Sequence, residues 1–174
     1  MTLTLRPAER RDVPALLAIE QAQFPEPWSR GMLLDELGQP ATRRYVVAIE
    51  DRRIVGYCGV MTVLDELHVN TLAVAPGEEG RGIATTLLAD ALDDAVARGL
   101  RRAILEVAVS NVRARALYQR FGFAPVGVRK NYYPPTREDA LVMWAELPAQ
   151  PATAALREPD GPAGETGPRP TLGP

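Results

Sequence analysis

The stretch VAPGEEGRGIATTLL, residues 74–88, runs from an apolar segment through a glycine-rich turn into a predicted helix. N–H groups at a helix N-terminus lack intrahelical partners, and the helix dipole adds partial positive charge, so such turns commonly bind phosphate. Glu78 and Glu79 stand at the entrance of this turn, where their negative charges would repel an anion. The alternative to a phosphate site is therefore an ordinary, well-capped helix start. The spacing matches neither the Walker sequence nor the dinucleotide fingerprint, and no Lys follows Gly82, so nucleotide triphosphate hydrolysis is unsupported.

Helical and strand-like patterns interleave on both sides of this turn. Asp12 and Ser29 are predicted helix N-caps, Gly99 is predicted to end the long helix, and the polar pair Asp51 and Arg52 predicts a hairpin. This order predicts an α/β fold in which helices cover a central mixed sheet. The predicted strands cover 3–6, 44–50, 53–61, 66–74, 102–109, 123–133 and 139–147, and the predicted helices cover 12–21, a short segment after 29, 82–98 and 111–121.

The composition changes abruptly after Leu147. Residues 148–174 hold seven prolines and four glycines in 27 positions, so this segment has almost nothing to bury and is predicted to be a disordered tail. Residues 1–147 are predicted to form one folded domain, which is long enough to bury about two-thirds of its unfolded surface.

Charge and cysteine content narrow the class of protein. A net charge of -2 gives no general electrostatic reason to bind a polyanion, which disfavours a nucleic-acid-binding module. One cysteine, Cys58, and one histidine, His68, exclude a disulfide framework and a metal site rich in Cys or His. Cys58 lies in an apolar strand with no evident base and is predicted to be a buried structural thiol. Without a signal-peptide pattern or a run of about 18 apolar residues, we expect a cytoplasmic protein with no membrane contact and no metal.

The second informative stretch is LEVAVSNVRARALYQRFGF, residues 105–123. Glu106 stands in an otherwise apolar strand, where an ionised carboxylate is costly unless it is paired, solvated in a cleft or protonated. In the helix that follows, Asn111, Ala114 and Tyr118 share one face because they are three and four residues apart. One face of this helix therefore offers an amide, a methyl-sized gap and a phenol.

These stretches together resemble the GCN5-related N-acetyltransferase (GNAT) superfamily, which transfers acetyl from acetyl-CoA to an amine. The resemblance rests on a pattern close to RxxGxG/A that opens a helix and on LEVxxSNxxAxxLYxxxGF, and it covers nearly the whole folded unit. It implies a single domain with a mixed, mostly antiparallel, splayed sheet flanked by about four helices. Glu79 stands where the pattern has Arg or Gln, and we expect its side chain to point into water, where screening limits its repulsion of phosphate.

Three further stretches resemble the bacterial family that acetylates the N-terminal alanine of a small-subunit ribosomal protein. They are FPEPWS at 24–29, LHVNTLAV at 67–74 and VRKNYYPPTREDALVM at 128–143. The resemblance implies acetyl-CoA as cosubstrate and a protein partner, a ribosomal protein, that presents a free N-terminus and attacks directly, without a covalent enzyme intermediate. The oligomeric state is left open, and a monomer is compatible with the sequence.

The resemblance also implies a role for individual residues. Glu106 corresponds to the general base and Tyr118 to the general acid of the family. Peptide-binding loops would contain Trp28, Tyr132 and Tyr133. Main-chain groups of the strand and of the glycine turn would hold the pantetheine and pyrophosphate, together with the Asn side chain, so the implied cofactor-binding residues are Leu72, Ala73, Val74, Gly80, Arg81, Gly82, Ile83, Ala84, Thr85 and Asn111.

Ordinary structural roles are the alternatives to these assignments. Glu106 can pair with a nearby arginine such as Arg102, and Tyr118 can be a core aromatic with its hydroxyl at the surface. Asn111 can simply cap its helix, and the loop aromatics can be core lids. Glu66 and His68 precede the acceptor-side strand and are either auxiliary bases or ordinary strand residues.

Two other functions stay open beside acetylation of a protein N-terminus. One is acetylation of lysine side chains or of a small-molecule amine. An α-amino group, with a pKa of about 7.7–8.0, is easier to deprotonate than a lysine near 10.4, which favours the N-terminus. The other is a catalytically silent acyl-CoA-binding sensor, and the presence of both Glu106 and Tyr118 argues against it.

Overall fold

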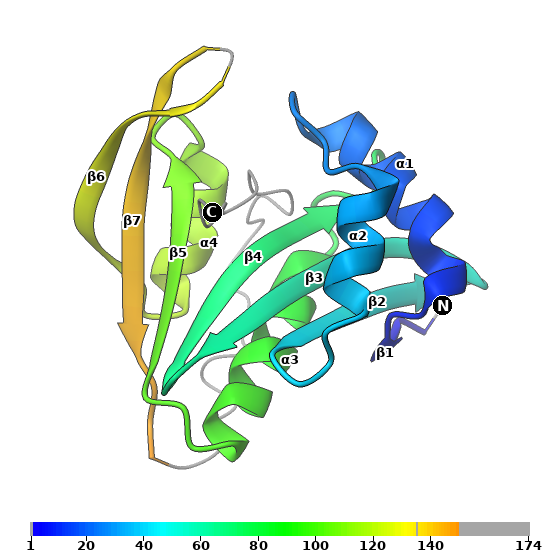
Figure 1. Cartoon of the computed structure of the whole chain (residues 1–174), viewed down its shortest axis with the longest axis horizontal. Coiled ribbons are helices and arrows are strands. Elements are labelled where there is room, and N and C mark those ends of the chain that lie inside the picture. Colours follow the sequence, from blue (N-terminus) through cyan, green and yellow to red (C-terminus); the bar gives the residue numbers. More distant parts are fainter. Residues whose placement is uncertain (1, 135, 150–174) are drawn as a thin grey trace.

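One sheet runs in the order β1-β2-β3-β4-β5-β7-β6 in the computed structural model, which describes residues 2–134 and 136–149 (Figure 1). Neighbouring strands are antiparallel except for β4 and β5, which are parallel. The expected mixed, mostly antiparallel sheet is therefore confirmed. Its strands are β1 (Thr4–Pro7), β2 (Arg43–Glu50), β3 (Arg53–Val63), β4 (Glu66–Val74), β5 (Arg102–Ala108), β6 (Ala124–Tyr133) and β7 (Glu138–Glu146).

Helices cover both faces of this sheet (Figure 1). The pair α1 and α2 packs on one face of β2, β3 and β4, whereas α3 and α4 pack on the opposite face. Within the described residues the helices are the short 3-10 helix η1 (Arg10–Asp12), α1 (Val13–Gln23), α2 (Arg30–Leu37), α3 (Ile83–Ala97) and α4 (Val112–Arg120).

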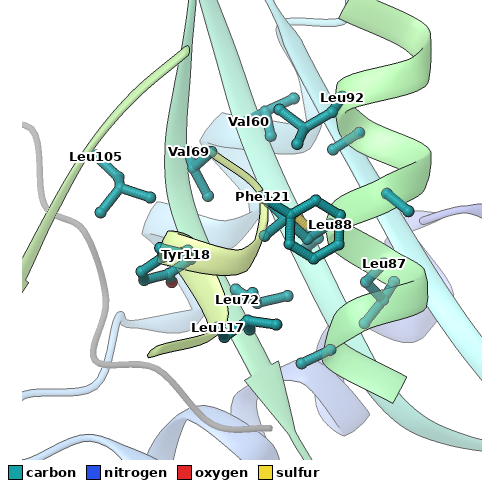
Figure 2. Packing of buried hydrophobic residues seen from close by; sticks show 14 of the residues in the cluster. Val60, Val69, Leu72, Leu87, Leu88, Leu92, Leu105, Leu117, Tyr118 and Phe121 are labelled. Atoms are coloured by element: carbon teal, nitrogen blue, oxygen red, sulfur yellow. The ribbon is translucent and has the colours of Figure 1, made fainter. Parts of the chain in front are cut away.

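The core divides into two layers that match these faces. The larger layer lies between the sheet and α3 and α4, and Figure 2 shows Leu87, Leu88 and Leu92 of α3 meeting side chains of the strands. The smaller layer lies beneath α1 and α2, where Leu16 and Leu33 are fully buried. Successive residues of a strand point to opposite faces of the sheet, so a continuously apolar strand contributes side chains to both core layers.

Several local signals produce the predicted turns and caps. Ser29 Oγ accepts a hydrogen bond from the Met32 amide and caps α2 as expected. Gly99, just beyond the end of α3, has a φ of 78°, a left-handed conformation that suits glycine at this place. Asp51 and Arg52 both have positive φ, which closes the predicted hairpin between β2 and β3.

Asp12 is the N-cap residue of α1 as predicted, but its side chain does not cap the helix amides. Its carboxylate makes an ion pair of 2.7 Å with Arg6 and accepts a 2.7 Å hydrogen bond from the Glu9 amide, so it closes η1 and holds β1 instead of capping α1. Arg6 keeps the pKa of Asp12 below its usual range.

The ends of the folded part were also predicted from composition. The division into a domain at 1–147 and a tail at 148–174 stays a prediction, because the tail beyond its first two residues lies outside the described residues. Among the described helices, none is long and apolar enough to span a membrane.

Candidate active site

The gap between β4 and β5 organises the site. These strands pair only between Glu66–His68 and Arg102–Ile104, after which β4 stays with β3 and β5 stays with β7 (Figure 1). Within the described residues, the later part of β4, including the predicted cofactor residues Leu72, Ala73 and Val74, therefore has no strand partner on its β5 side. An unpaired strand edge presents main-chain N–H and C=O groups to an extended ligand.

Glu106 lies on β5 two positions past Ile104, the last residue of this strand that pairs with β4. Its side chain is 1% exposed. Its neighbours Leu105 and Val107 point into the core below α3 and α4, so the carboxylate faces the opposite side of the sheet. Burial raises the pKa of Glu106, and the charge of Arg129 opposes this shift. A carboxyl group with a raised pKa suits a general base near neutral pH.

An arginine does pair with Glu106, as the structural alternative expected, but it is Arg129 and not Arg102. Arg129 Nη2 on β6 lies 3.2 Å from Glu106 Oε1, an ion pair that lacks hydrogen-bond geometry. Arg102 instead stacks over the Trp144 ring at 3.9 Å and lies 3.4 Å from both Glu66 and Glu146. Arg102 is not the partner of Glu106, because Glu106 lies four positions further along β5. The antiparallel pairing of β5 with β7 and of β7 with β6 instead brings Arg129 close to Glu106.

Tyr118 lies on α4 and is completely buried. Its ring packs edge-on against Phe123 with 5.8 Å between ring centroids, and Figure 2 shows it between Leu105 of β5 and Leu72 of β4. Among the described residues its hydroxyl has no hydrogen-bond partner, and burial raises its pKa. The expectation of a surface hydroxyl, made for the purely structural role, is therefore wrong. A protonated, unpartnered phenol facing the gap can donate to an incoming group.

Asn70 was not predicted as a site residue, yet it stands where β4 leaves β5. Gly59 of β3 faces Thr71 while Val60 faces Val69, so Asn70 is the extra residue of a β-bulge. Its side chain is 4% exposed, and its Oδ1 has no hydrogen-bond partner among the described residues. A polar residue within the apolar run of β4 is the sequence signal that could have marked it.

The glycine turn leads into α3 as the opening pattern predicted. Gly77, Gly80 and Gly82 have φ values of 85°, 76° and 78°, and a Cβ at any of them would meet nothing within 4 Å. Gly82 is the N-cap and provides no side-chain cap to the helix amides. Successive left-handed glycines beside open space form a concave main-chain surface that suits the phosphates of a nucleotide cosubstrate.

The two carboxylates of the turn are held by protein groups. Glu78 pairs with Arg53 and Arg81, and Arg81 also lies 2.7 Å from Glu50. The positive charge of Arg81 is therefore largely neutralised by protein carboxylates.

The expectation that Glu79 points into water holds only in part, because its half-exposed side chain also bonds to protein groups. Its carboxylate accepts a 2.7 Å hydrogen bond from the Gly77 amide within the turn and a 3.3 Å bond from Gln23 Nε2 at the end of α1. Backbone and Gln23 hydrogen bonds keep the pKa of Glu79 low, so the side chain stays anionic beside the turn.

The remaining predicted cofactor residues lie around the start of α3 and α4. Asn111 caps α4 by accepting a 3.0 Å hydrogen bond from the Ala114 amide, which is the structural role foreseen for it. Thr85 Oγ1 accepts a bond from Arg120, which ties α3 to α4. Ile83 and Ala84 are buried in the first turn of α3.

The predicted peptide-binding aromatics come from two separate loops. Trp28 belongs to the α1–α2 connection, and its amide donates a 2.9 Å hydrogen bond to the buried Glu20. Tyr132 and Tyr133 at the end of β6 meet edge-on at 5.0 Å. Burial raises the pKa of Tyr133, and the charges of Tyr132 and Glu106 add to this shift. In Figure 1 these loops flank the divergence of β4 and β5.

The other titratable candidates lie away from the open part of the gap. Glu66 and His68 are in the segment where β4 and β5 still pair, with His68 Nε2 at 3.4 Å from Glu66. Burial lowers the pKa of His68, and Glu66 opposes this shift. Cys58 is buried as predicted, and burial raises the pKa of its thiol to about 12.

Comparison with known proteins decides the family. A model of the acetyltransferase (GNAT) family matches residues 13–123. The chain belongs to the acetyltransferase (GNAT) family. This membership confirms the resemblance and makes the protein an acyltransferase.

Relatives within the acetyltransferase family are similar over most of their length. The ribosomal protein bS18-alanine N-acetyltransferase of Haemophilus ducreyi is 38% identical over 136 residues, which are 76% of this chain and 92% of the relative. The enzyme of the same name from Escherichia coli strain K12 is 34% identical over 144 residues, or 80% and 95% of the two chains. The crystal structure of the ribosomal-protein-S18-alanine N-acetyltransferase from Escherichia coli superimposes with a TM-score of 0.79 at 31% identity and covers 87% of this chain and 97% of that chain.

Proposed function

We propose that this acetyltransferase transfers the acetyl group of acetyl-CoA to the α-amino group of the N-terminal alanine of ribosomal protein bS18. The relatives that bear this activity in their names are 34% and 38% identical over three quarters or more of the chain. The observation that carries the proposal is the buried Glu106 carboxylate on the face of β5 that the loops of Trp28 and Tyr133 flank. A ribosomal substrate would place the reaction in the cytoplasm.

The glycine turn and the free edge of β4 fit acetyl-CoA. Leu72, Ala73 and Val74 would hold its pantetheine through their main chain, and the turn around Gly80 and Gly82 would hold its pyrophosphate. The remaining members of this set would be Arg81, Ile83, Ala84, Thr85 and Asn111. Acetyl-CoA supplies the thioester that the amine attacks.

Amide formation removes two protons from the substrate ammonium and adds one to the leaving sulfur, and Glu106 and Tyr118 would act as the base and the acid in these transfers. Glu106 would take a proton from the substrate ammonium, because burial makes its carboxylate more basic than an exposed one. Tyr118 holds a proton on its buried hydroxyl and would deliver it to the leaving sulfur. Tyr118 belongs to the core layer of α3 and α4, whereas Glu106 faces the other side of β5, so each would serve a different side of the bound thioester.

The test offers purified protein acetyl-CoA and a peptide with the N-terminal sequence of bS18, and follows acetylation by mass spectrometry. A peptide with a blocked N-terminus and an internal lysine is the matched control. We expect acetylation of the free α-amino group alone. Modification of the blocked peptide would favour the lysine acetyltransferase, and CoA binding in calorimetry without turnover of any amine would favour the sensor.

A further inference from the structure

The face of the sheet in front of Glu106 is covered by side chains of β6. The core layer beneath α1 and α2 draws its strand residues from β2, β3 and β4 within the described residues. Over β5 and β7, the groups near Glu106 are Arg129, Tyr132 and Tyr133. An amine that reaches the carboxylate from this face must therefore pass β6 side chains.

Arg129 reaches Glu106 diagonally across β7. Arg129 is in register with Ala140 and Ala108, whereas Glu106 is in register with Val142 and Gly127. All these residues point to one face, because each pair is two positions from the other along its strand. Besides Val142, the neighbours of Arg129 and Glu106 in these two rows are small, two alanines and a glycine, which leaves room for the long arginine to lie over the sheet.

The hold of Arg129 on the carboxylate is weak. The 3.2 Å ion pair lacks hydrogen-bond geometry, and the guanidinium also stands 5.5 Å above the Tyr132 ring. Its side chain is 49% exposed, whereas that of Glu106 is 1% exposed. Regular pairing of β6 with β7 is interrupted just after Arg129, and Asn131 there has a φ of 54°. The arginine can thus move into solvent without unpacking the core.

We infer that Arg129 is a displaceable counter-ion that occupies the place of the substrate ammonium on Glu106 and gives way when the amine arrives. An ammonium and a guanidinium carry the same charge, so the exchange never leaves the buried carboxylate without a cation. The inference rests on the proposed function, because it takes Glu106 as the group that meets the amine. Arg129 is a positioning residue here and does not touch the reacting atoms.

The exchange keeps a cation on the carboxylate until the proton moves. Arg129 lowers the pKa of Glu106 against the effect of burial, and the incoming ammonium takes over this effect until it gives up its proton. One N–H bond of the ammonium then breaks as an O–H bond forms on Glu106, and the neutral amine keeps its electron pair for attack. The other titratable groups near this place are Tyr118 on α4, Tyr132 and Tyr133 on β6 and Glu138 on β7.

The test compares the wild-type protein with Arg129→Gln, Arg129→Lys and the control Lys130→Gln. Lys130 is the next residue of β6 and pairs with Asp139 at 3.2 Å in solvent. Steady-state kinetics across pH 6–9 would give the KM of the peptide and the acidic limb of kcat/KM. Site-resolved ¹³C NMR would follow the Glu106 carboxyl in the unliganded protein, independently of turnover.

For Arg129→Gln we expect a peptide KM about two- to fivefold lower above the acidic limb, since no cation must be displaced. We also expect the limb and the Glu106 titration to move to higher pH, an unchanged KM for acetyl-CoA, and near wild-type behaviour of Arg129→Lys and Lys130→Gln. A higher peptide KM with an unmoved limb would overturn the inference, because it would show that Arg129 binds the peptide. An unchanged Glu106 titration would overturn it as well. Absence of turnover in the wild-type protein would instead overturn the proposed function.

Discussion

Glu20 should hold the α1–α2 connection against the sheet. Its carboxylate is fully buried on α1, where Oε2 accepts a 2.9 Å hydrogen bond from the Trp28 amide and Oε1 accepts one from the Tyr57 hydroxyl. The Thr71 hydroxyl lies 3.5 Å from Oε1. Three donors around two oxygens match a group that only accepts, so the site is built for a carboxylate. Removing the carboxylate should loosen the connection that carries Trp28.

The size of the effect follows from these contacts. In Glu20→Gln the amide can accept from the Trp28 amide and donate to the Tyr57 oxygen, so charge-assisted bonds become neutral at a cost of about 1–2 kcal/mol. In Glu20→Ala all three donors lose this acceptor and a cavity remains, which should cost about 3–5 kcal/mol.

Urea unfolding measures this cost, and Gln21→Ala, an exposed change on the same helix, should stay within about 0.5 kcal/mol of wild type. The peptide KM of Glu20→Gln should rise while the KM of acetyl-CoA stays constant. A cost below about 1 kcal/mol for Glu20→Ala would refute the role of the carboxylate. A lower stability with an unchanged peptide KM would show that Trp28 does not contribute to peptide binding.

Four further outcomes are expected. Tyr118→Phe should lower kcat by about ten- to a thousandfold with unchanged CoA affinity, and undiminished turnover would remove Tyr118 from the acid role. Glu79→Gln should tighten acetyl-CoA binding modestly in calorimetry, and more at low salt, because it removes an anion beside the turn; equal affinity at every ionic strength would contradict this. Ser29→Ala should cost about 1 kcal/mol in urea unfolding through loss of the α2 cap, and no loss would show that water replaces the hydroxyl. Asp12 has a lowered pKa, so its pairing with Arg6 stabilises the protein above the unfolded value of about 4 and is lost as the pH falls through the folded value. The stability deficit of Arg6→Ala should therefore shrink below about pH 4, and a pH-independent deficit would be evidence against the pair.

Some of the candidate site was predictable because its signals are local. Glu106 is conspicuous as a carboxylate in an apolar strand, and Tyr118 follows from helical spacing within the same stretch. Glu20 gave no such signal, because it fits the helical stripe of α1 and its partner Tyr57 is 37 residues away in the chain. Arg129 was equally hidden, since nothing near it in the sequence shows that it reaches Glu106.

The sequence by itself determined the order of strands and helices, the cap at Ser29, the glycine turn before α3 and the resemblance to the acetyltransferases. These features depend on residues that are close together in the chain, so their spacing in the sequence is enough to predict them. Tertiary structure alone decided where β4 leaves β5, that Asn70 forms a bulge there, and that Arg129 pairs with Glu106. With 20 lysines and arginines in the chain, many cations are equivalent by sequence, and strand register and burial select the one that reaches a buried carboxylate.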